Sequence, residues 1–354
     1  MSVFYQKAPF PWFGGKSKAA PLIWRALGDV DHYVEPFCGS LATLLLRPHE
    51  CNRTYYSETV NDLDGFIVNF WRSVQLSPDA TAEAASWPVS EADLHARHLR
   101  LLRWRSECDL ERLMGDPEWH DPKMAGWWAW GQSSWIGGGW CSGKGSWVVG
   151  ADGRIERRKG GRGVFRARPH ISDNGQGVNR ATLREPGVGE YEFHPMTMPE
   201  LRHWFAFLAA RLRHVRVLNG DWKRATTNGA SKTLPVRAGG ACGIFLDPPY
   251  SERAGRAEIY SEESFAVAHA VREWALGRGT DEDTRIVVAG FEGEHPELDA
   301  AGWRCVEWFS AGFLSGGMGG TGNQQRRERL WLSPHCLSLE PAPNPQMDFF
   351  DEQP

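Results

Sequence analysis

The sequence predicts an α/β protein built on a doubly wound, mostly parallel sheet. Short apolar runs of strand length alternate with stretches of helical period between residues 19 and 76, and strand-like runs resume after residue 214. Each of these runs ends in a polar or glycine-containing turn. A repeated order of strand, turn and helix is typical of a parallel sheet with helices on its faces, because parallel neighbours need a long crossover between them.

The individual elements follow from the same patterns. Helices are predicted at residues 19–27, 41–46 and 66–76, and a longer charged helix at residues 91–112. Strands are predicted at residues 33–35, 55–60, 215–218, 243–246 and 285–289. Ligands of doubly wound sheets bind at the carboxyl ends of the strands. The polar residues at these ends are therefore the first candidates for a binding site.

Composition limits the functional class. The chain has 354 residues, 41% hydrophobic residues and a formal net charge of only -4, so any contact with nucleic acid must come from a local patch of cations. Its seven cysteines form no CxxC pair and no Cys/His ligand spacing, which predicts reduced thiols, a cytoplasmic setting and no metal site. We expect no membrane segment, because the sequence shows neither a charged-then-apolar leader nor a run near ~18 apolar residues.

A break in the pattern predicts the domain organisation. Residues 1–78 and 201–336 are expected to form the sheet domain, residues 79–200 an insert, and residues 337–354 a disordered tail. The insert is rich in tryptophan and glycine, and its tryptophans could pack a core or stack on bases. It also holds a basic, glycine-rich loop suited to DNA phosphates, although a solvated loop is the plain alternative. The cations of this loop are Arg154, Arg157, Arg158, Lys159, Arg162, Arg166 and Arg168.

The tail carries a short motif of its own. After a proline-rich spacer it reads Gln346-Met347-Asp348-Phe349-Phe350. This spacing resembles the peptide that docks on the bacterial sliding clamp, with Met and Phe in place of the usual leucines. A frayed tail without a partner explains the segment equally well.

The apolar run at residues 243–246 ends in Asp247-Pro248-Pro249-Tyr250, which suits methyl transfer to an exocyclic amine of a nucleobase. Such an amine is a poor nucleophile, because its lone pair is delocalised into the ring. A carboxylate and a fixed backbone carbonyl that accept its two hydrogens would free the lone pair. The prolines stiffen the backbone, so that the carbonyl of Pro248 can stay beside Asp247. Tyr250 offers a stacking face for a base taken out of the helix.

A methyl donor must then bind next to Asp247. Near the N-terminus, Trp12, two glycines and Lys16 offer an aromatic ring, close backbone approach and an ammonium for a carboxylate such as that of a methionine moiety. The turn at residues 37–40 opens a helix and offers amide donors for the same zwitterionic end. Asp62 follows the second strand, where an acid commonly accepts ribose hydroxyls. Asp221 could accept from an adenine amine, with Trp222 packed on the ring.

These segments, taken together, resemble the Dam-type (alpha-group) adenine-specific DNA methyltransferases. The resemblance is carried by Trp12-Phe13-Gly14-Gly15-Lys16, residues 34–40, residues 61–64, Gly220-Asp221-Trp222, Asp247-Pro248-Pro249-Tyr250 and residues 326–334. It implies a Rossmann-like methyltransferase fold, S-adenosylmethionine as cofactor, double-stranded DNA as substrate and a monomer encoded by a bacterium or a phage. In such enzymes the positions that match Trp12, Lys16, Asp62 and Asp247 contact the cofactor. The full set of predicted cofactor-binding residues is Trp12, Gly14, Lys16, Glu35, Phe37, Gly39, Asp62, Asp221, Trp222 and Asp247.

Two departures from the family limit what the resemblance transfers. Ser40 and Leu41 stand where the family often has a second glycine. The resemblance makes the insert at residues 79–200 the target-recognition region. Because this tryptophan-rich insert differs from that of Dam, a GATC target cannot be transferred to this chain.

Three other functions remain open at this point. The 4-amino group of cytosine presents the same chemical problem to the same four residues, 247–250. RNA could be the substrate, with the tryptophans stacking on single-stranded bases. A non-catalytic DNA-binding protein with a relic cofactor pocket is the third alternative. Methylation of a cytosine ring carbon is not expected, because none of the seven cysteines follows a proline.

Overall fold

The computed structural model describes twelve segments of the chain. They are residues 6–12, 15–48, 57–107, 112–113, 116, 118–135, 140–141, 147–149, 155–157, 196–249, 262–308 and 328–339.

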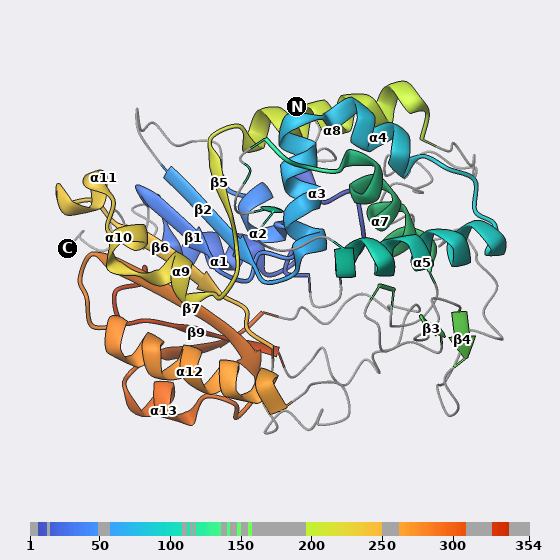
Figure 1. The fold of residues 1–354 in the computed structure, drawn as a ribbon. Coiled ribbons are helices and arrows are strands. Elements are labelled where there is room, and N and C mark those ends of the chain that lie inside the picture. Colours follow the sequence, from blue (N-terminus) through green and yellow to red (C-terminus); the bar gives the residue numbers. More distant parts are fainter. Residues whose placement is uncertain are drawn as a thin grey trace, which may run out of the picture.

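A seven-stranded sheet forms the centre of the molecule (Figure 1). Its strands are β1 (His32–Glu35), β2 (Ser57–Asp62), β5 (Val215–Asn219), β6 (Cys242–Leu246), β7 (Thr284–Phe291), β8 (Arg304–Glu307) and β9 (Glu328–Leu332). They lie in the order β5-β2-β1-β6-β7-β9-β8, and only β9 runs antiparallel to its neighbours. The predicted doubly wound, mostly parallel, Rossmann-like sheet is confirmed.

The strand order changes direction between β1 and β6. From β1 the chain winds outward through β2 and β5, and then returns to add β6 and β7 on the other side of β1. Ligands of such sheets bind where the winding direction changes, outside the carboxyl ends of the strands. The ends of β1 and β6 therefore define the expected position of a binding site.

The predicted strands and helices are present with shifted boundaries. The strand predicted at residues 55–60 is described from Ser57 and continues to Asp62, because it pairs with β5 as far as the partners Asp62 and Asn219. The helix predicted at residues 91–112 corresponds to α5 (Glu91–Glu107). A two-stranded sheet of β3 (Trp147–Val149) and β4 (Ile155–Arg157) was not predicted.

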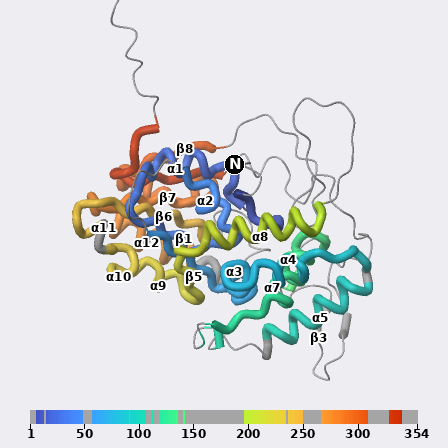
Figure 2. The backbone as a smooth tube through the Cα atoms, turned by 90° about the horizontal axis from the view of Figure 1, so that it is seen from above, coloured from blue at the N-terminus to red at the C-terminus, as the bar shows by residue number. Residues whose placement is uncertain are grey.

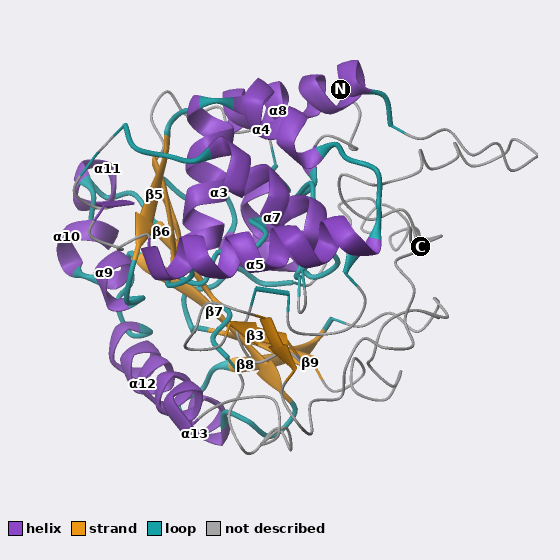
Figure 3. Cartoon of the chain, turned by 45° about the vertical axis from the view of Figure 1, so that its right-hand side comes forward, coloured by secondary structure: helices purple, strands orange, loops and turns teal. Residues whose placement is uncertain are grey.

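Helices cover both faces of the large sheet (Figure 3). On one side lie α1 (Ala20–Leu27), α2 (Ala42–Leu45), α3 (Gly65–Leu76) and α8 (Met198–Leu212), and on the other α9 (Lys223–Thr226), α10 (Asn228–Ser231), α11 (Leu234–Arg237), α12 (Glu262–Arg278) and α13 (Pro296–Ala300). Successive strand residues serve the two sides in turn, since side chains alternate along a strand. Tyr33 and Phe245 lie in the core under α1 and α3, whereas Val34 and Ile244 lie in the core under α12.

The described part of the insert packs on α3 and α8 through α4 (Pro78–Ala85), α5 and α7 (Pro122–Ser134) (Figure 2). Trp104, Trp128 and Trp130 are buried in one core with Phe66 of α3, and Trp128 lies 4.9 Å from Phe10 between ring centroids. Most of the described tryptophans of the insert therefore serve packing. The division into residues 1–78 with 201–336, 79–200 and 337–354 stays a prediction.

None of the described helices is both long enough and apolar enough to cross a membrane.

Candidate active site

Four strand ends bring acidic and amide side chains to one edge of the sheet. Glu35 ends β1, Asp62 ends β2, Asn219 ends β5, and Asp247 directly follows β6. Pairing between buried parallel strands fixes the positions of these ends. The register pairs Glu35 with Val60 and Asp62 with Asn219. The polar ends predicted from the sequence thus share a single edge at the point where the winding reverses.

Two asparagines tie these ends to one another. The side-chain amide of Asn61 donates to the carbonyl of Pro36 at 3.0 Å and to that of Gly220 at 2.9 Å. The amide of Asn219 donates to the carbonyl of Asp62 at 2.9 Å. Asn61 is almost completely buried, so its bonds replace water at three chain segments and hold the edge rigid.

Residues 37–40 form a tight turn above Asp62. Gly39 has a φ of 43°, and its N–H donates to Oδ2 of Asp62 at 2.9 Å. A Cβ atom at this position would lie 2.4 Å from Nε1 of Trp12, so only glycine fits. On the other side, Nε1 of Trp71 donates to the carbonyl oxygen of Gly39 at 2.9 Å. The turn is therefore held between Trp12, Trp71 and Asp62.

Leu41 follows this turn, at the departure from the family pattern. It adopts a left-handed backbone with a φ of 54° at the start of α2, and its side chain is fully buried. Left-handed geometry costs a leucine more than a glycine. Burial of the side chain in the core offsets that cost, so the turn forms without a second glycine.

Asp62 is held by backbone donors. Its Oδ1 accepts the N–H of Asp64 and its Oδ2 the N–H of Gly39, both at 2.9 Å. Burial raises the pKa of Asp62 to about 6, and these two bonds counteract the rise. Because a carboxylate has about four lone-pair sites, Asp62 keeps acceptor capacity beyond these two bonds and the weak contact of Cys38 Sγ with its Oδ2 at 4.0 Å.

Lys16 and Asp247 form an ion pair. Nζ of Lys16 lies 2.8 Å from Oδ2 of Asp247, and their side chains are 3% and 20% exposed. Burial raises the pKa of Asp247, while the charge of Lys16 and its hydrogen bond lower it. The sequence predicted the carboxylate of the methyl donor as a partner of Lys16, whereas the structure pairs Lys16 with the carboxylate of Asp247. Pro248 is buried and Pro249 half-buried directly after it.

Glu35 lies beneath these groups. Its Oε2 accepts the hydroxyl of Tyr33 at 3.1 Å, and both side chains are buried. Burial raises the pKa of Glu35 to about 8, and the negative charges of Asp247 and Asp62 add to the rise. At neutral pH this carboxyl is therefore mostly protonated.

Phe37 and Trp222 form an aromatic wall beyond the turn. Their ring centroids are 6.1 Å apart with 29° between the planes, and Trp222 is buried. Asp221 is exposed, and its Oδ1 accepts the N–H of Lys223 at 2.8 Å. The carboxylate of Asp221 thus also supports the turn into α9.

Other predicted site residues lie outside the described residues. They are Gly14, Tyr250, Arg154, Arg158, Lys159, Arg162, Arg166, Arg168 and the tail motif at residues 346–350. For Arg157 only the backbone, in β4, is described.

Sequence patterns assigned no individual role to Asn61, Asn219 or Trp71. An asparagine beside a site acid has no sequence pattern of its own. Asn61 is the next-to-last residue of β2, and Asn219 is the last residue of β5. Trp71 lies within an apolar helix, where its ring was indistinguishable from ordinary core.

Comparison with known families agrees with this geometry. Residues 12–94 match the family model described as D12 class N6 adenine-specific DNA methyltransferase. None of the curated proteins compared with the chain matches it. The matched stretch contains Trp12, Lys16, Glu35, Gly39 and Asp62, and it confirms the predicted family resemblance. The predicted class of enzyme, a methyltransferase acting on adenine in DNA, is confirmed with it.

Proposed function

We propose that this chain transfers the methyl group of S-adenosylmethionine to the 6-amino group of an adenine extruded from double-stranded DNA. The observation that carries the proposal is the Lys16–Asp247 pair at the reversal between β1 and β6, beside the turn that Asp62 holds. The carboxylate that we assign to the amine and the candidate cofactor contacts lie at one edge of the sheet, which supports the proposal.

The residues present fit the cofactor. Gly39 leaves room where a side chain would collide with Trp12, which supports close approach of a ligand to the backbone. Asp62 retains acceptor capacity for the ribose hydroxyls, and the rings of Phe37 and Trp222 offer an apolar wall for an adenine base. Lys16, Gly14 and Glu35 complete the proposed set. When bound, S-adenosylmethionine would supply an electrophilic methyl group on a sulfonium.

Asp247 and the Pro248 carbonyl carry the chemistry in this proposal. They would accept hydrogen bonds from the two N–H groups of the amine, which would free the nitrogen lone pair to take up the methyl group. The sulfur would keep the bonding electrons as a neutral thioether, and the methylated nitrogen would release one proton. Tyr250 stacks on the extruded base. Orientation of the two reactants supplies a large part of the acceleration, and no covalent enzyme intermediate is needed.

Lys16 has a second task in this mechanism. Only an ionised Asp247 has all its oxygen lone pairs available for hydrogens, yet burial favours the protonated form. The ammonium 2.8 Å away favours the carboxylate. Lys16 therefore keeps Asp247 ready to accept.

Substitution of Asp247 tests the proposal. Transfer of labelled methyl to duplex DNA should fall by orders of magnitude in Asp247→Ala, with part of the cofactor binding retained. Lys18→Ala, an exposed position two residues from Lys16, serves as the control. Undiminished transfer in Asp247→Ala would contradict the assignment. If the wild-type protein transfers no methyl group, the non-catalytic DNA-binding protein would be the better description of this chain.

Cytosine is the closest alternative acceptor, because its 4-amino group poses the same problem to Asp247. Hydrolysis of the modified DNA to nucleosides and mass analysis separates the two products. Competition between duplex DNA and RNA decides the nature of the substrate strand.

The remaining assignments are proposals of the same kind. We infer that the basic residues between Arg154 and Arg168 contact DNA phosphates and that residues 346–350 bind a sliding clamp. We also propose that the protein is a monomer, that it acts in the bacterial cytoplasm, and that a bacterium or a phage encodes it.

A further inference from the structure

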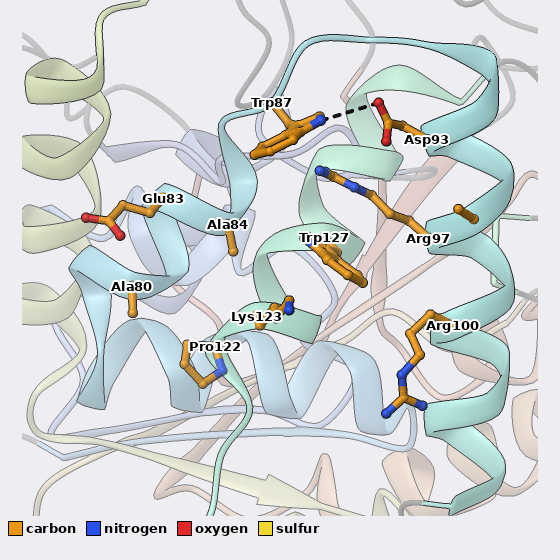
Figure 4. A pocket seen from close by; sticks show the side chains of 11 residues that line it. Ala80, Glu83, Ala84, Trp87, Asp93, Arg97, Arg100, Pro122, Lys123 and Trp127 are labelled. Carbon is orange, nitrogen blue, oxygen red and sulfur yellow. Dashed lines mark hydrogen bonds between the residues drawn. The ribbon is translucent and has the colours of Figure 1, made fainter.

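A hollow of about 650 Å³ lies between α4, α5 and α7, on the described helices of the insert (Figure 4). Small side chains, among them Ala80, Ala84 and Pro122, leave it open. Lys123 of α7 and Arg100 of α5 lie on either side of it. The hollow contains none of the residues assigned to methyl transfer.

A buried guanidinium lies in the wall of the hollow. Arg97 is only 5% exposed, and its Cζ lies 4.8 Å from the ring of Trp87, 5.0 Å from that of Trp127 and 4.4 Å from that of Trp130. Among the described residues its Nη1 atom is buried and has no hydrogen-bond partner. A buried cationic donor without a partner is costly, and the surrounding rings compensate for only part of that cost. The charge of Asp93, which also lines the hollow, provides a further part of the compensation.

The two acids that line the hollow, Glu83 and Asp93, both have partners. Glu83 forms an ion pair with Arg202 of α8. Oδ2 of Asp93 accepts the hydroxyl of Ser90 at 2.7 Å and the Nε1 hydrogen of Trp87 at 3.3 Å. The side between α5 and α7 thus carries three cations, Arg97, Arg100 and Lys123, against the one acid Asp93.

Aromatic faces lie beside these cations. Trp87 is 50% exposed, an unusual fraction for so large an apolar side chain. The half-buried ring of Trp127 lies 5.0 Å from Nζ of Lys123. Flat rings next to cations, in an open hollow, are the combination by which proteins bind an unpaired nucleic-acid strand.

We propose that this hollow binds a single-stranded stretch of nucleic acid, with phosphates at Arg100 and Lys123 and a base stacked on Trp87. The inference rests on the proposed function only for the class of ligand, because a DNA methyltransferase meets such strands at frayed or replicating DNA. Arg97 contributes a positive potential behind the rings. Contact with DNA would then extend beyond the adenine that is methylated.

Binding of a fluorescein-labelled 12-mer of thymidine to the full chain, followed by anisotropy at several salt concentrations, tests this proposal. Trp87→Leu should weaken binding roughly 5- to 150-fold, the usual range for one lost stacking partner. Trp87→Phe keeps a flat ring and should retain most of the affinity. For Lys123→Gln the slope of log K against log salt should fall by about 0.7, and for Arg100→Gln with Lys123→Gln by about 1.4.

Arg237→Gln provides the matched control. Arg237 is exposed on α11, at the opposite end of the molecule from α5 in Figure 1. Its loss removes the same charge without touching the hollow, so affinity and salt slope should stay at the wild-type values. Thermal unfolding of every variant shows whether it is folded.

Two results would overturn the proposal. One is wild-type affinity and salt slope in both Trp87→Leu and the double variant. The other is displacement of the 12-mer by an acidic, aromatic peptide more readily than by unlabelled oligonucleotide, which would indicate a protein partner. Because the assay measures binding alone, a chain that binds the 12-mer through the hollow but transfers no methyl contradicts only the proposed function.

Discussion

Nζ of Lys16 lies 2.8 Å from Oδ2 of Asp247, so the N-terminal segment and the end of β6 meet in a buried ion pair. Most of Lys16 is inaccessible to water, and a buried ion pair of this kind depends on both partners. The pair links the segment that opens the family match with the carboxylate proposed to bind the amine.

The first prediction concerns the pH dependence of catalysis. Burial raises the pKa of Asp247, and Lys16 opposes the rise. Lys16→Met removes that opposition, so the pKa of Asp247 should rise further. On acidification the variant should therefore lose methyl transfer at a higher pH than the wild type does. The acidic limb of kcat/KM against pH measures this shift. Lys18→Met should leave the limb in place, and an unshifted limb in Lys16→Met would show that the pair does not control Asp247.

A second prediction tests the support of the turn at residues 37–40. Trp71→Phe keeps a buried ring but removes the donor to the carbonyl of Gly39. A buried carbonyl that loses its donor costs about 1–3 kcal/mol, so KM for the cofactor should rise roughly fivefold or more, with kcat at saturation nearly unchanged.

Trp204→Phe is the matched control for that experiment. Trp204 is also fully buried, and its Nε1 donates to a backbone carbonyl, that of Lys7, at 3.2 Å. It should lose comparable stability without a change in KM. An equal rise of KM in both variants would reduce the role of Trp71 to general packing.

Stability should depend on pH through Glu35. Its pKa is about 8 in the folded protein against an ordinary 4.5, so between these values the folded protein holds a proton that the unfolded chain has released. Stability therefore falls as pH rises through this window, by up to about 1.4 kcal/mol for each pH unit. Glu35→Gln lacks this titrating carboxyl group. The stability of the variant relative to the wild type should therefore increase as the pH rises. Denaturant unfolding at several pH values measures the difference, and parallel curves would refute the assignment.

A buried charge cluster under the sheet predicts a large stability effect. Both oxygens of Glu58 are bound, by Arg47 at 3.0 Å and by Arg211 at 2.7 Å and 2.8 Å. Glu58→Gln removes the charge that two guanidinium groups share, and should cost about 3–5 kcal/mol. Glu83→Gln breaks an exposed pair and should cost at most ~1 kcal/mol. Similar small losses in both would mean that Glu58 contributes little.

Deletion of residues 346–350 tests the predicted clamp peptide. Binding of the full chain to a bacterial sliding clamp, measured by surface plasmon resonance, should disappear in the shortened chain while methyl transfer to short duplexes persists. Binding that survives the deletion, or wild-type protein that does not bind, would remove the clamp as a partner.

The sheet and its polar strand ends were predictable because both leave local patterns. An apolar run followed by Asp247, or by Asn61 and Asp62, marks a buried strand and the point where it leaves the core. The direction of β9 was not predictable, since an apolar run carries no sign of whether its neighbour is parallel.

Contacts between distant segments also lay beyond the sequence. Lys16 has an obvious charge, but its partner depends on how the segment before α1 folds back over β6. The tryptophans of the insert illustrate a different ambiguity. Core packing and base stacking demand the same residue, and only the structure separates buried Trp128 from exposed Trp87.

Leu41 has a consequence for finding relatives of this protein. A pattern that demands glycine there would pass over any chain that shapes the same bend with a buried aliphatic residue. Searches for relatives should therefore accept either a glycine or a buried aliphatic residue at this position. Chains dismissed for lacking that glycine can still form the same turn.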